Sequence, residues 1–198
     1  MIKNIVFDIG NVLVHYRPMD YLEKRYARED ADFLLAAIFE SAEWVGLDKG
    51  TLTEDEALKR FIARAPEKEA HLREVMGDLS TIFTPIESSI AILKELRKAG
   101  YNMLYLSNIS HNIFAFITRT YDFMEEFVGG IASAKVQTLK PGEDIYHHLI
   151  TQYAIKPEET VFIDDTDHNI QAAIVLDFKT IHLTDPDDLK SKLAELGV

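Results

Sequence analysis

Carboxylates follow two short apolar runs of this 198-residue chain, at the points where each run stops. Asp8 follows residues 5–7, and the adjacent pair Asp164 and Asp165 follows residues 160–163. A buried strand that ends on an acid delivers the carboxylate to the carboxyl edge of a parallel sheet, where α/β proteins bind ligands. Carboxylates gathered there disfavour one another's ionisation, and a hard divalent cation relieves that repulsion. Oxygen ligands in a chain without cysteine favour Mg²⁺ over zinc.

Two further polar residues fit a phosphate group. Ser107 ends the apolar run at residues 102–106 and offers a hydroxyl, while Lys140 follows the short run at residues 128–134. A lysine ammonium is a point charge that can pair with phosphate and with the acidic pair. Together these residue types predict a phosphoryl-transfer site with a carboxylate nucleophile.

Each of these signals also has a purely structural explanation when it is taken alone. Asp8 can open a turn after a strand, Ser107 can cap a strand end, and a lysine before a proline says little about function. The paired acids say more, because two carboxylates at the end of a buried strand need a partner. The functional interpretation therefore depends on all the signals lying at matching strand ends.

The elements that must position these residues alternate between strands and helices in the later part of the chain. Apolar runs predict strands at residues 2–8, 102–106, 128–134, 160–163 and 178–183. Amphipathic helical segments separate the strands after residue 85, which is the order of a doubly wound parallel α/β sheet. The carboxyl ends of such strands gather at one edge, and this edge receives the acids, Ser107 and Lys140.

A long helical segment interrupts this alternation after the first strand. Residues 19–83 show helical spacing, with a capping box formed by Thr53 and Glu56, and residues 44–52 are predicted to be a turn-rich connector. We expect a catalytic core at residues 1–15 and 85–198, and a helical cap at residues 16–84 that lies over the site. The alternative is that these helices cover one face of the sheet.

Composition limits the partners and the compartment. The net charge of -12 argues against a nucleic-acid backbone as partner, and an anionic substrate would need a local metal ion, lysine or arginine. No uninterrupted apolar run reaches membrane-spanning length, so no membrane partner is expected. The lack of cysteine and of a recognisable signal peptide leads to an expectation of a cytoplasmic protein.

With these motifs in order, the chain resembles the haloacid dehalogenase superfamily of phosphohydrolases, in particular members with a small helical cap. Four segments carry the resemblance, namely residues 8–12, 106–108, 140–141 and 163–169. The first segment and residues 48–53 look most like a bacterial sugar-phosphatase branch that includes glucose-1-phosphate phosphatases. The phosphatase domain of soluble epoxide hydrolases is a more distant relative.

The resemblance implies a Mg²⁺-dependent phosphatase of small phosphate esters, such as sugar phosphates. Asp8 would attack phosphorus and become an aspartyl phosphate, which water then hydrolyses. Mg²⁺ would be held by Asp8, the backbone carbonyl of Gly10 and Asp165. Asp164 would orient Lys140 or a metal-bound water.

The resemblance also assigns the substrate contacts. Ser107, Asn108 and Lys140 would bind the phosphoryl group. Substrate specificity should come from the cap and from the flap after the first strand, with Asn11, His15 and Trp44 as the candidate contacts.

One position departs from the family pattern. The family usually places a second aspartate two residues after the nucleophile as general acid and base, and this chain has Gly10 there. General acid–base help typically supplies roughly a hundredfold to ten-thousandfold in rate. Either His15 or Asn11 takes over this task, or the substrates have good leaving groups, such as anomeric sugar phosphates or acyl phosphates.

Three rival functions remain on the sequence alone. A dehalogenase would use Asp8 without metal, but its fourth motif lacks an acidic pair. A phosphonate-cleaving enzyme needs a cap lysine for a Schiff base, and the candidates are Lys24, Lys49, Lys59 and Lys68. The third is a non-catalytic phosphate-binding protein that has lost its acid.

Overall fold

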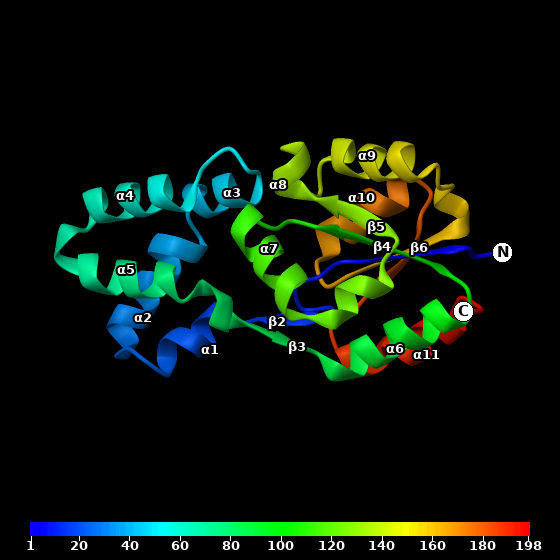
Figure 1. The fold of residues 1–198 in the computed structure, drawn as a ribbon, viewed down its shortest axis with the longest axis horizontal. Helices are drawn as coiled ribbons and strands as arrows, with labels where there is room; N and C mark the ends of the chain where they lie inside the picture. Colours follow the sequence, from blue (N-terminus) through cyan, green and yellow to red (C-terminus); the bar gives the residue numbers. More distant parts are fainter.

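A five-stranded parallel sheet forms the centre of the protein, as a computed structural model describing residues 1–198 shows (Figure 1). The strand order is β5-β4-β1-β6-β7. The strands are β1 (Asn4–Phe7), β4 (Asn102–Ser107), β5 (Gly129–Ala132), β6 (Thr160–Asp164) and β7 (Lys179–His182). The predicted doubly wound α/β fold is confirmed.

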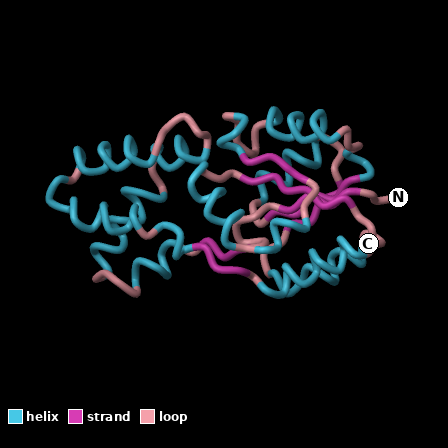
Figure 2. The backbone as a smooth tube through the Cα atoms, viewed as in Figure 1, coloured by secondary structure: helices cyan, strands magenta, loops and turns pink.

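Helices cover both faces of this sheet. One face is packed by α6 (Glu87–Lys98), α7 (His111–Thr120) and α11 (Leu189–Glu195), and the other by α8 (Ser133–Val136), α9 (Glu143–Tyr153) and α10 (Asp167–Val175) (Figures 1 and 2). No helix has both the length and the apolar character needed to cross a bilayer.

Alternate residues of the central strands face opposite layers. Val6 lies beside Leu104 and Phe162 in the sheet, and all three belong to the apolar cluster under α9 and α10. The next residue back, Ile5, belongs to the opposite cluster. A strand with two buried faces therefore has a continuous apolar sequence, which explains why residues 5–7 carry no polar alternation.

The strand order reverses at β1. After β1 the chain builds β4 and β5 on one side, then returns to place β6 on the other side. A crevice outside the carboxyl ends of the strands forms at such a reversal, because the loops diverge to opposite faces. Asp8 and Asp164 stand at the ends of the two strands that flank it.

A helical insert occupies the chain between two short strands, β2 (Val14–Tyr16) and β3 (Phe83–Pro85). These strands pair antiparallel and carry the chain out of the sheet and back (Figure 1). The insert contains α1 (Pro18–Glu23), α2 (Arg28–Leu34), a π-helical turn (Leu35–Phe39), α3 (Ala42–Asp48), α4 (Glu54–Arg64) and α5 (Glu69–Gly77). Short 3-10 turns lie at Pro66–Lys68, Leu79–Ile82, Asp122–Glu126, Pro157–Glu159 and Pro186–Asp188.

One local prediction about this insert was wrong, and one feature of it was not predicted. The predicted connector at residues 44–52 largely forms helix α3, which begins after Ser41 because its hydroxyl accepts a hydrogen bond from the Trp44 N–H at 3.1 Å. The β2–β3 ribbon was not predicted, because each strand has three residues and the pairing joins segments far apart in sequence. The predicted capping box of Thr53 and Glu56 is present at the start of α4.

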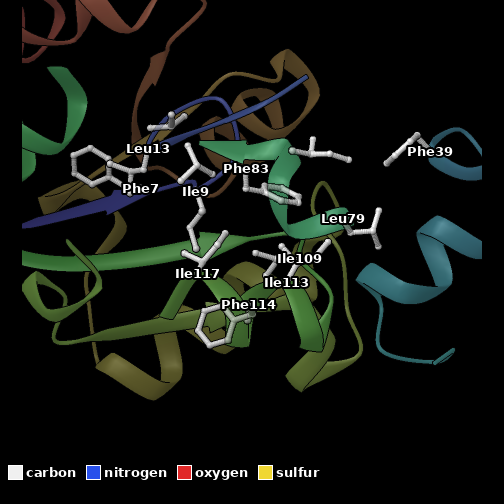
Figure 3. Close-up of a cluster of buried hydrophobic side chains, with 14 of the residues drawn as sticks. Phe7, Ile9, Leu13, Phe39, Leu79, Phe83, Ile109, Ile113, Phe114 and Ile117 are labelled. Atoms are coloured by element: carbon white, nitrogen blue, oxygen red, sulfur yellow. The ribbon is translucent and has the colours of Figure 1, made fainter. Parts of the chain in front are cut away.

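Apolar side chains connect the insert to the sheet layer without a break. Figure 3 shows Phe39 and Leu79, from the insert, next to a cluster that continues through Phe83 and Ile113 toward Phe7 under the sheet. Burial of this shared cluster ties the position of the insert to the core. The insert therefore stands in a defined place beside the carboxyl edge.

The insert and the core also meet where Gly50 reaches Ala134. Gly50 has a φ of +70°, and a Cβ built on it would lie 2.3 Å from the Ala134 carbonyl oxygen. Nearby, the Ser133 hydroxyl donates to the Asp48 carbonyl and accepts from the Ile109 N–H. The backbone around residues 48–50 is thus held against the core at van der Waals distance.

We expect Gly50→Ala to lower the free energy of unfolding by about 2 kcal/mol or more, because left-handed backbone and a backbone clash both act against it. Urea denaturation measures the loss. Gly77→Ala is the matched control, since a Cβ at Gly77 meets nothing within 4 Å at the end of α5. Equal stability of the two variants would contradict the close contact.

Candidate active site

Asp8 lies directly after β1 with only 8% of its surface exposed. Its backbone N–H donates to the Ile163 carbonyl at 2.8 Å, which continues the sheet pairing to the carboxylate. One carboxylate oxygen, Oδ1, accepts from the Ile9 N–H at 2.7 Å and lies 3.0 Å from the Lys140 ammonium. Asp8 is therefore fixed at the sheet edge with one oxygen engaged.

Lys140 is buried and reaches the same point from the loop after α8. Its ammonium donates to Asp164 Oδ2 at 2.6 Å and to the Leu106 carbonyl at 2.9 Å. Asn108 holds its backbone through two hydrogen bonds, accepting from the Lys140 N–H and donating to the Lys140 carbonyl. The peptide bond to Pro141 is cis. The second and third predicted motifs thus meet directly.

Asp164 is fully buried and has its hydrogen-bonding capacity in use. Beside the Lys140 contact, its oxygens accept from the Thr166 N–H at 2.8 Å and from the Asn169 amide at 3.0 and 3.1 Å. A carboxylate with this many donors holds its neighbours in place. Asp164 is a positioning residue for Lys140, and Asn169 is a contributor that the sequence patterns did not single out.

Asp165, the residue after β6, is only half-buried. Its carboxylate accepts from the Asn11 amide at 3.0 Å and from the Thr166 hydroxyl at 3.2 Å, while its carbonyl lies 3.0 Å from His182 Nε2. The Asn11 carbonyl oxygen in turn accepts from the Tyr16 N–H at 2.9 Å. Asn11, predicted as a substrate contact, is thus engaged in orienting Asp165.

The three acids form a cluster that could hold a metal ion. One oxygen from each of Asp8, Asp164 and Asp165 lies within 4.8 Å of the others. Asp164 is already occupied by four hydrogen bonds, so Asp8 and Asp165 are the carboxylates left to bind a cation. Oxygen donors of this kind suit Mg²⁺.

Charge in this cluster is unbalanced without a cation. The pKa of Asp8 is raised to about 7, mainly by burial. The charges of Asp164 and Asp165 also act to raise it, while the Lys140 ammonium acts to lower it. Burial acts to lower the pKa of Lys140, but the carboxylates of Asp8 and Asp164 raise it overall. Lys140 therefore stays charged and compensates Asp164, and Asp8 is left with the surplus negative charge that a cation would neutralise.

A cavity of about 70 Å³ lies between the sheet edge and the insert. Its core side includes Ile9, Gly10, Ser107, Asn108, Ile109 and Ile113, and its other walls are Val14, Tyr16, Trp44, Asp48 and Phe83. Tyr16 stacks between Trp44 and Phe83, with ring centroids 6.1 and 5.4 Å apart. Trp44, predicted from sequence as a substrate contact, does line this cavity.

The structure places His15 outside this cavity and Asp48 in its wall. His15 pairs with Thr84 in the β2–β3 ribbon and does not line the cavity that contains Gly10. It borders two other depressions together with Arg17, and one of them also includes Asn11 and Asp165. Asp48 also lines the cavity, whereas in the sequence it stood out only as part of the predicted connector and of the 48–53 segment that resembles the sugar-phosphatase branch.

Residues 2–177 match the family model of haloacid dehalogenase-like hydrolases. The chain belongs to this family of enzymes.

Two curated relatives are phosphatases. The sesquiterpene phosphatase astK of Aspergillus oryzae is 24% identical over 183 residues, covering 92% of this chain and 90% of that protein. The D-ribitol-5-phosphate phosphatase of Bacteroides thetaiotaomicron is 24% identical over 205 residues, covering 98% of this chain and 97% of that protein.

A solved structure shares the fold. A variant of a HAD family enzyme from Bacteroides thetaiotaomicron, in complex with magnesium and inorganic phosphate, superposes with a TM-score of 0.74 at 20% identity. The alignment covers 91% of this chain and 93% of that one. The two proteins therefore share the same overall fold.

We expect Asp164→Asn to lower the free energy of unfolding by about 3 kcal/mol, because it removes one partner of a buried ion pair. Urea denaturation of the metal-free protein measures this loss. Asp167→Asn, an exposed acid three residues further on, is the control and should change stability by less than about 0.5 kcal/mol. If the two variants are equally stable, Asp164 does not hold Lys140.

Proposed function

We propose that this protein is a Mg²⁺-dependent phosphatase of small phosphorylated metabolites that works through an aspartyl phosphate on Asp8. The observation that carries this proposal is the meeting of Asp8, Lys140 and the Asp165 carboxylate at one sheet edge, beside Ser107. A nucleophilic carboxylate, a lysine ammonium held in place and a second carboxylate that can bind a metal ion are the parts that phosphoryl transfer needs.

Each residue has a defined task in this proposal. Asp8 attacks phosphorus with the carboxylate oxygen that Lys140 and Ile9 leave free. Lys140 and Ser107 bind oxygens of the transferring group and so place it for attack. Asp164 keeps the Lys140 ammonium in position, and Asn108 keeps its backbone in position.

The residues present fit a magnesium ion. Asp8, the backbone carbonyl of Gly10 and Asp165 would hold it, and Asn11 and Thr166 orient the Asp165 carboxylate. When bound, Mg²⁺ neutralises negative charge on Asp8 and on the phosphoryl oxygens. The raised pKa of Asp8 supports this need for a cation, because an acid with a pKa of about 7 is only half ionised at neutral pH without one.

The rival functions have less support. The insert lysines that a phosphonate-cleaving enzyme would need are absent from the cavity, since Lys24, Lys49 and Lys59 are exposed and Lys68 pairs with Asp30. A dehalogenase has no use for a metal-binding carboxylate at Asp165. A binding protein without catalysis would not need a nucleophile buried next to a lysine.

Sugar or polyol phosphates are the proposed substrates, with prenyl phosphates as the competing class. The aromatic walls formed by Tyr16, Trp44 and Phe83 can pack on the C–H face of a polyol or on a hydrocarbon chain. The two curated relatives are named for one substrate of each kind. A panel with ribitol 5-phosphate, glucose 1-phosphate and a prenyl phosphate separates these classes.

We expect the purified protein to release phosphate from an aryl phosphate in the presence of Mg²⁺, and Asp8→Asn to abolish this activity, because an amide is a poor nucleophile. Phosphate release measures both. Asp167→Asn is the control and should keep full activity. An active Asp8→Asn protein, or full activity in excess chelator, would contradict the proposed mechanism.

Mg²⁺ should raise the melting temperature of the protein more at about pH 8 than at about pH 5.5, because the metal binds the ionised form of Asp8 and protons compete below its raised pKa. Without metal, the contribution of Asp8 to folding stability changes with pH in the opposite direction. A raised carboxyl pKa favours the folded state at low pH, and this stability is lost as the pH rises through about 7.

Differential scanning fluorimetry with and without Mg²⁺ measures this shift at constant ionic strength. At a hundredfold excess over the dissociation constant, the ion should add about 2.7 kcal/mol. Asp165→Asn should remove most of the shift, while Asp167→Asn should keep it. A shift that does not depend on pH, or that survives in Asp165→Asn, would place the ion elsewhere.

A further inference from the structure

One acid of the insert reaches the cavity. Asp48 is the last residue of α3 and the only carboxylate among the residues that line the cavity beside Gly10 and Ser107. The Asp8 charge adds to the effect of burial in raising the pKa of Asp48, so the two carboxylates are close enough to repel each other. Asp48 thus enters the cavity from the insert, whereas Gly10, two residues after the nucleophile, lines it from the core.

The backbone at Asp48 is anchored to the core. The Ser133 hydroxyl donates to the Asp48 carbonyl and also accepts from the Ile109 N–H, so a single side chain joins the insert to the loop after β4. The close approach of Gly50 to Ala134 fixes the next turn. Asp48 is therefore held in place over the site.

The surroundings of Asp48 disfavour its ionised form, so this residue does not stabilise the fold by its charge. A carboxylate at the end of a helix faces the negative pole of the helix dipole, and no basic residue lies in the last turn of α3. Burial and the Asp8 charge also disfavour the ionised form, which only the Ser110 N–H favours. An acid kept at such a place calls for a functional reason.

No other side chain next to Gly10 is available to act as the missing acid. Gly10 has no side chain, and a Cβ built on it would meet no atom within 4 Å. Asn11 is engaged with Asp165 and Tyr16, and His15 lies outside the cavity. Tyr16 also lines the cavity, but burial and the Asp48 charge raise its pKa above its ordinary value, so its hydroxyl stays protonated and is a poor proton donor.

We propose that Asp48 is the general acid and base of the reaction, taking the place of the acid that Gly10 lacks. This inference rests on the proposed phosphatase function. The pKa of Asp48, raised by burial to about 7, supports it, because a group that is half protonated near neutral pH can both give and accept a proton.

The proposed steps balance in atoms and charge. Asp8 forms a bond to phosphorus while the bond from phosphorus to the ester oxygen breaks, and the carboxylic acid of Asp48 gives its proton to that leaving oxygen. The Asp48 carboxylate then takes a proton from water, whose oxygen attacks the aspartyl phosphate. The bond from phosphorus to Asp8 breaks, inorganic phosphate leaves, and Asp48 is protonated again.

The test compares the first turnover of two aryl phosphates. 2,4-Dinitrophenolate leaves without a proton, whereas the phenolate of phenyl phosphate needs one. In Asp48→Asn we expect a fast burst of dinitrophenol followed by slow turnover, because the base for hydrolysis is missing. Phenol release should fall about a hundredfold or more in the first turnover.

Controls separate this role from a structural one. Asp55→Asn, an exposed acid of α4, should behave as the wild type. Asp48→Glu should restore part of the phenyl phosphate rate. Adding Gly10→Asp to Asp48→Asn should also restore it, because the φ of Gly10 accepts a side chain and the space is open. If Asp48→Asn does not fold, Asp48→Ser with the same rescue answers the question.

The outcomes are distinct. Equal slowing of both substrates in the first turnover, unchanged kinetics, or the absence of any rescue would overturn the role of Asp48. A wild-type protein without Mg²⁺-dependent release, or an active Asp8→Asn variant, would instead overturn the phosphatase itself.

Discussion

The Lys140 ammonium, buried between the carboxylates of Asp8 and Asp164, is the interaction on which the site depends. It joins the ends of β1 and β6 to a loop that arrives from the far side of β4. A single positive charge cannot neutralise two buried acids, and the hydrogen bonds around Asp164 direct the charge toward that residue. The remaining negative charge at Asp8 suits the two roles proposed for this residue, as metal ligand and as nucleophile.

Sequence patterns predicted the core and its acids because both depend on short-range information. A buried parallel strand is an apolar run in sequence, and the residue at its end is at the sheet edge wherever the strand lies in the order. The positions of Asp8, Ser107 and Asp164 follow from this rule. Lys140 was harder to place from the residues alone, since its loop is set by reciprocal hydrogen bonds with Asn108.

The insert was predicted less well, because its geometry depends on long-range packing. Gly46 and Gly50 resemble turn signals, yet Gly46 lies inside α3, which packs against the core through Trp44 and Leu47. Tertiary burial overrides local propensity in such a segment. The 48–53 segment carries a family resemblance, but the place of Asp48 in the cavity wall depends on the fold of the insert as a whole.

The hydrogen bond from Ser133 to the backbone of Asp48 has a consequence for which substrates can react. Since the proton carrier belongs to the insert and the nucleophile to the sheet, the two halves of the chemistry are complete only while this link is made. An ester too bulky for the insert to settle over would meet the nucleophile alone. Selection by size would then act on the chemical step itself, in addition to binding.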